Sequence, residues 1–67
     1  MISNETVGAM MHATFIVAPN AKVQETIGQM VQRNKLAGET NEVIVLALAD
    51  VISDGLRHGN WPKRDED

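Results

Sequence analysis

The sequence contains no cysteine, which excludes disulfide bonds and thiolate zinc sites as sources of stability. Its only two histidines lie far apart in the chain and belong to no paired ligand motif, so we expect no metal and no cofactor. There is no glycine-rich phosphate loop and no serine or cysteine nucleophile beside a histidine, so no catalytic residue is assigned. These absences argue against an enzyme.

Charge and long apolar runs are also scarce. The net charge of −3 provides no basic patch of the kind that marks many nucleic-acid-binding proteins. No stretch approaches the roughly 20 predominantly apolar residues that a membrane span requires. We therefore expect a cytoplasmic protein without a membrane partner.

A chain of 67 residues forms one small domain. A domain of about 60 residues buries only about 60% of the surface that its unfolded chain exposes. With disulfides and metals set aside, association with a second copy is the remaining way to stabilise such a domain.

Residues 43–49 read VIVLALA, a run without a polar face. As part of a helix from about Thr40 or Asn41 to Leu56 or His58, this run is hydrophobic on every side and must be covered on every side. One short chain has little else to cover it, so we expect an obligate homodimer. Its expected core consists of Phe15, Val17, Ile27, Val43, Ile44, Leu46, Ala47, Leu48 and Val51.

A second helix is predicted to begin at Ala21, because Asn20 is a good N-cap and Pro19 disfavours helix before it. It ends before Gly38, which suits a left-handed position after a helix. The segment 59–62 breaks the last helix, and residues 63–67 form a charged tail expected to be disordered. Trp61 either folds back over the last helix or serves as an exposed anchor for a partner protein.

Two interpretations of the N-terminal part remain open. Thr14-Phe15-Ile16-Val17 favours a strand by residue type. A helix beginning at Ser3 or Asn4 is favoured by spacing, because apolar residues recur at helical intervals. Those residues are Val7, Met10, Met11, Thr14, Phe15 and Ala18.

If the first segment is a strand, the order of elements resembles the ribbon-helix-helix repressors of the Arc and MetJ type. The resemblance covers roughly residues 12–56 and is carried by residues 14–17, the break at Pro19-Asn20, the helical apolar positions and the string NEVIVLAL at 41–48. It implies a mainly α homodimer whose two-stranded ribbon enters the DNA major groove. The implied base-reading residues are His12, Thr14 and Ile16, and the implied phosphate contacts are Lys35, Thr40 and Asn41.

The resemblance thus predicts a small dimeric transcriptional regulator, a repressor or an antitoxin-like protein such as phages and plasmids encode, bound to double-stranded DNA. It divides the chain into an N-terminal arm at 1–11, a dimerisation and DNA-binding domain at 12–58 and a charged tail at 59–67. If the first segment is a helix, the expectation is instead an all-α three-helix homodimer. Such a protein would bind and inhibit a partner protein without binding DNA.

Overall fold

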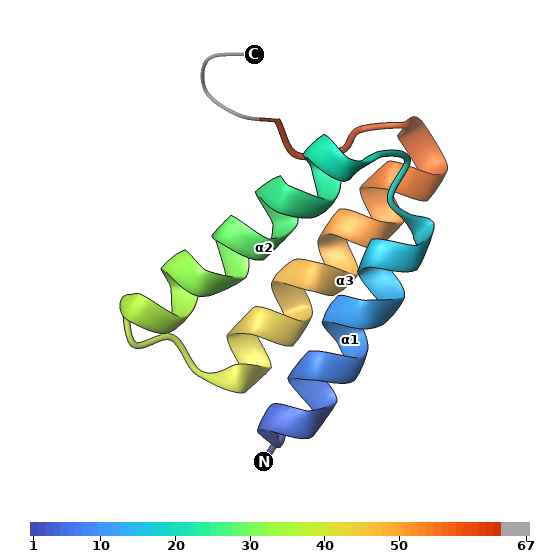
Figure 1. The fold of residues 1–67 in the computed structure, drawn as a ribbon. Coiled ribbons are helices and arrows are strands. Elements are labelled where there is room, and N and C mark those ends of the chain that lie inside the picture. Colours follow the sequence, from blue (N-terminus) through green and yellow to red (C-terminus); the bar gives the residue numbers. More distant parts are fainter. Residues whose placement is uncertain (64–67) are drawn as a thin grey trace.

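The computed structural model describes residues 1–63, which form three helices joined by short connections. They are α1 (Asn4–Val17), α2 (Ala21–Leu36) and α3 (Asn41–His58). Figure 1 shows that α1 and α3 run in the same direction, whereas α2 runs opposite to both. The described residues form a three-helix bundle.

The ribbon-helix-helix expectation is wrong, because residues 1–63 contain no strand and residues 14–17 belong to α1. The helix begins after Ser3, whose hydroxyl oxygen accepts a 3.2 Å hydrogen bond from the Thr6 amide. Val7 and Thr14, two helical turns apart, are both buried. Helical spacing therefore outweighs the strand preference of the residue types, and the alternative three-helix fold is confirmed. The segment expected to be a separate arm, 1–11, contributes most of its residues to α1.

The bounds of α2 and α3 follow the local signals in the sequence. The Asn20 side chain caps α2 by accepting a 2.9 Å hydrogen bond from the Val23 amide. Gly38 has a φ of 82°, the left-handed conformation expected after the helix. The Thr40 hydroxyl caps α3 in the same way, and α3 ends at His58, followed by the C-cap residue Gly59 with a φ of 66°.

Five aliphatic side chains form the buried core between the helices. They come from all three helices and are Val7, Ile27, Val31, Ile44 and Leu48. The interface of α1 with α3 is the most extensive of the three helix pairs. One chain therefore covers Ile44 and Leu48 completely, although both were expected to need a second copy.

The other expected dimer-core residues divide into two groups. Phe15, Ala47 and Val51 are half-buried within the single chain. Val17, Val43 and Leu46 are exposed in the single chain, with 38%, 42% and 66% of their surface accessible. The α3 helix is therefore covered on one side and open on the other, because α1 and α2 together reach only about half of its circumference.

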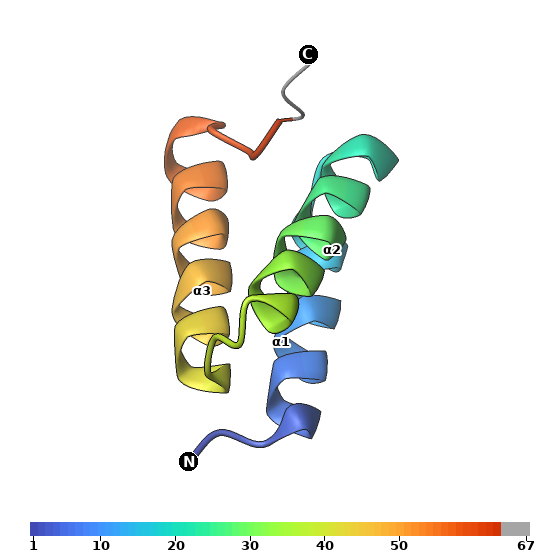
Figure 2. The same ribbon diagram turned by 90° about the vertical axis from the view of Figure 1, so that its left-hand side faces the viewer.

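After α3 the chain folds back across the end of the bundle toward the start of α2 (Figure 2). The Trp61 ring lies directly against Gly55, and a methyl group at that position would overlap the indole. Gly55 is buried and Trp61 is half-buried. Of the two roles considered for Trp61, the structure supports folding back over α3. Residues 64–67, most of the expected disordered tail, lie outside the described part of the chain.

Gly55→Ala is expected to lower the free energy of unfolding by about 1–2 kcal/mol. The new methyl group takes the space of the Trp61 ring and displaces its apolar surface into water. Urea denaturation followed by far-UV circular dichroism measures this change. The fluorescence emission of the folded variant should also shift to the red, because the indole becomes more exposed to water. The signal can be assigned because Trp61 is the sole tryptophan.

Gly28→Ala is the matched control, because a methyl group there meets Phe15 Cζ at 3.8 Å, an ordinary contact. It should raise stability by about 0.5–1 kcal/mol through helix propensity. In a Trp61→Ala background, Gly55→Ala should no longer be destabilising. An equal loss of stability with and without Trp61 would show that this contact is not the cause.

Candidate protein-interaction surface

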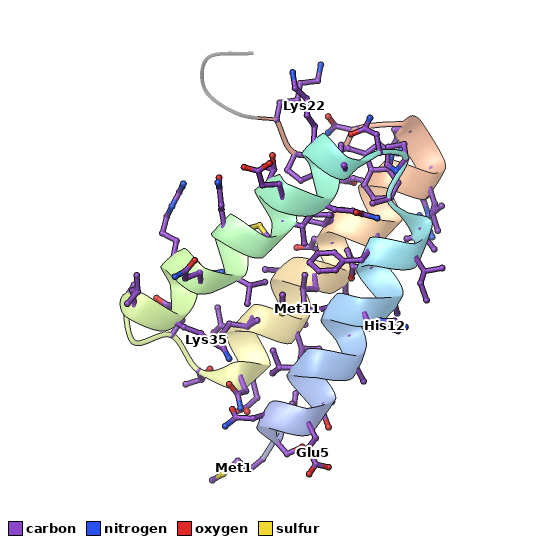
Figure 3. All side chains as sticks on the ribbon, in the orientation of Figure 1. Met1, Glu5, Met11, His12, Lys22 and Lys35 are labelled. Atoms are coloured by element: carbon purple, nitrogen blue, oxygen red, sulfur yellow. The ribbon has the colours of Figure 1, made fainter. Side chains whose placement is uncertain are left out.

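The three residues expected to read DNA bases do not share a surface. In a strand, alternate residues point to one face, but in a helix residues two apart point to nearly opposite sides. His12 and Ile16 are accordingly exposed on the outside of α1, and Figure 3 shows His12 pointing away from the bundle. Thr14 is fully buried, and its hydroxyl donates a 2.7 Å hydrogen bond to the Met10 carbonyl oxygen. The ribbon on which the base-reading role depended is absent from residues 1–63.

The start of α3, where a phosphate was expected, is bonded to the start of the chain. The side-chain amide nitrogen of Asn41 donates to the main-chain carbonyl oxygen of Ile2 at 2.9 Å and to the side-chain oxygen of Asn4 at 3.0 Å. The Glu42 carboxylate accepts a 3.2 Å hydrogen bond from the Ile2 amide. These bonds join α1 and α3 at one end of the bundle, which is a structural role.

The other two residues expected to contact phosphate, Thr40 and Lys35, lie at helix ends. The Thr40 hydroxyl accepts from the Val43 amide at 3.3 Å, so it caps α3. Lys35 is exposed in the last turn of α2. A bound anion at this end would meet the carboxylates of Glu39 and Glu42 nearby in the sequence.

Exposed apolar side chains are the most distinctive feature of the surface. Among the described residues, seven large apolar side chains are exposed, whereas five apolar side chains are buried. The exposed ones are Met1, Ile16, Val17, Leu36, Val43, Leu46 and Leu56. Single exposed apolar residues are common, whereas continuous apolar patches indicate contact with another molecule. The arrangement of these residues on the helices therefore decides whether they form a surface.

One group lies on the outside of α3 near its start. Val43 and Leu46 are one helical turn apart and are flanked by Glu42 and Asp50. We call these four residues the α3 outer stripe. The whole segment from Leu36 to Leu56 contains four acidic residues and no basic residue. The stripe is therefore apolar at its centre and negatively charged around it.

A second group lies where α1 and α3 pass side by side, away from α2. Phe15 marks the side of α1 that faces α2, because its ring Cζ lies 3.8 Å from the position of a Cβ built on Gly28 of α2. Residues on the other flank of α1, at 100° per residue, lie beside α3. We call this surface the α1–α3 face; it comprises Thr6, Ala9, Ala13, Val17, Val45, Ala49, Ile52 and Leu56.

Apart from Glu42 at its N-terminal edge, bonded to the Ile2 amide, the α1–α3 face carries no charged side chain. The chain has no charged residue between Glu5 and Lys22, which leaves nearly all of α1 uncharged. The sequence shows this uncharged stretch but not its surroundings in the fold. The information that it belongs to an exposed helix beside α3 comes from the tertiary structure.

Other kinds of site find no support in the described chain. Within residues 1–63, no group of three or more histidine, aspartate or glutamate side chains is placed to hold a metal ion. None of the three helices is sufficiently long and apolar to cross a membrane. The chain matches no family model, no curated protein and no solved structure. Its function must be argued from its own surfaces.

Leu48→Ala is expected to lower the free energy of unfolding by about 2–5 kcal/mol, because Leu48 is fully buried and the truncation leaves a cavity. Leu46→Ala should change it by no more than about 0.5 kcal/mol, because Leu46 is 66% exposed. Urea denaturation of both variants at one low protein concentration compares them. Equal losses would mean that Leu46 is buried after all.

Proposed function

We propose that this protein is a non-enzymatic helical module that binds and occludes another protein through the α3 outer stripe. The observation that carries the proposal is the exposure of Leu46, at 66%, on a helix whose opposite side is fully buried. Burying such a side chain in a partner is favourable by about 1.5–3 kcal/mol. Folding of the single chain leaves this free energy unused.

The chemistry of the stripe describes the partner. Two aliphatic side chains one turn apart on a rigid helix suit an apolar groove, the mode in which an amphipathic helix is bound by its exposed face. Glu42 and Asp50 on either side favour a groove with basic residues at its rim. We therefore propose a partner that has an apolar groove bordered by lysine or arginine.

Insertion of a ribbon into DNA is not part of this proposal, because residues 1–63 contain no strand to form it. The acidic segment from Leu36 to Leu56 would also repel phosphates. The same charges would speed association with a basic protein surface.

A photo-crosslinking amino acid at position 46 tests the proposal in cells of the source organism. We expect it to capture a protein that the same group at Gln29, an exposed position on α2, does not capture. Purified partner and protein should then bind in a calorimeter. Leu46→Asp should weaken binding by at least about tenfold, since it places a charge in the apolar groove.

Gln29→Asp is the matched control, because it adds the same charge at an exposed position on a different helix and should leave the affinity unchanged within about twofold. Higher salt should also weaken binding if the groove has a basic rim. If the captured protein binds Leu46→Asp as tightly as the original chain, the outer stripe is not the binding surface. If position 46 captures nothing beyond position 29, the proposed function fails.

A further inference from the structure

The three faces of the bundle differ sharply in charge. The face between α1 and α2 includes Glu25 and Lys35, and the face between α2 and α3 includes Arg33, Asp50 and Asp54. Among the described residues, the α1–α3 face carries a single charge, Glu42 at its edge, where the carboxylate accepts a hydrogen bond from the Ile2 amide. Its exposed residues on α1 are mostly small, which allows another helix to approach closely.

The area of this face sets what can bind to it. The chain extends 32 Å along its longest axis and 17 to 23 Å across, so one side of the bundle measures about 540 to 740 Å². A specific interface of standard size buries about 800 Å² per partner. A dimer of so small a chain therefore needs the whole of one side, and that side must not bury unpaired charges.

Charge also determines which orientation of a second copy is favourable. Each copy carries a net charge of −3, so two copies repel, and the repulsion is smallest where the contact surface carries few charges. Because α1 and α3 run in parallel, both of their N-terminal ends, with Glu5 and Glu42, lie at one end of the bundle. The opposite end carries Arg57 and His58 in the last turn of α3.

We propose that two copies of this chain associate through their α1–α3 faces, related by a twofold axis perpendicular to the helices. In this arrangement the acidic end of one copy lies over the end of the other that bears Arg57, and the helix dipoles oppose. The α1 and α3 helices of one copy then pack against those of the other in antiparallel orientation, with Ala9, Ala13 and Ala49 near the middle of the interface. The interface leaves Val43, Leu46 and Asp50 of the α3 outer stripe accessible and does not rest on the function proposed for that stripe.

This assignment differs from the dimer expected from the sequence. That dimer placed Ile44, Leu46 and Leu48 at its centre. The single chain already buries Ile44 and Leu48, so they are not available to a second copy. Leu56 and Val17, 63% and 38% exposed, lie on the α1–α3 face instead.

Sedimentation equilibrium of the full chain, from about 1 µM to about 1 mM, covers the range in which a dimer of this size should form. We expect a transition from 7.3 kDa to twice that mass. Ala13→Glu, which puts a charge at the middle of the face, should weaken association by at least about 100-fold. Gln32→Glu, an exposed change on α2, should leave it unchanged.

Both variants should keep the far-UV circular dichroism of the original chain, because both positions are exposed on helices. Leu56→Glu should weaken association as Ala13→Glu does. A chain that remains at 7.3 kDa up to about 1 mM overturns the proposal, as does a dimer that tolerates both substitutions. Leu46→Asp should leave the dimer intact, so failure of partner binding and failure of dimerisation are measured separately.

Discussion

The packing of α1 against α3 is the contact on which the rest of the structure depends. Val7 and Thr14 on α1 and Ile44 and Leu48 on α3 are all fully or almost fully buried. At one end, hydrogen bonds from Asn41 to the first residues of the chain hold the two helices in register. Without α1 as a helix, α3 would expose two more aliphatic side chains to water.

This arrangement leaves the chain with more apolar surface than its core uses. Beyond the part that is covered, α1 exposes Ile16 and Val17, and α3 exposes Val43, Leu46 and Leu56. On α3 these apolar side chains lie among exposed charged residues, whereas α1 is charged only at Glu5. The uncovered sides of α1 and α3 are therefore where binding to other proteins is physically favourable. Their different charge surroundings distinguish the surface that we propose for a second copy from the surface that we propose for a basic partner.

The sequence predicted α2 and α3 nearly to the residue, because their ends are determined by local chemistry. Asn20 and Thr40 supply oxygen atoms to the first amides of each helix, and Gly38 adopts a conformation that other residues avoid. The first segment also has a local cap, Ser3, but its residue types and its spacing favour different structures. Thr14 and its neighbours favour a strand by type and a helix by spacing, and only packing against α3 selects the helix.

The candidate surfaces show the same division. The sequence alone determined that residues 43–49 are too apolar to be exposed on every side and that nearly all of α1 carries no charge. The tertiary structure decided which of those residues are covered, burying Ile44 and Leu48 while leaving Leu46 exposed. The physical reason is that periodicity defines how side chains are distributed around a helix, whereas the directions from which other helices approach depend on contacts between distant parts of the chain.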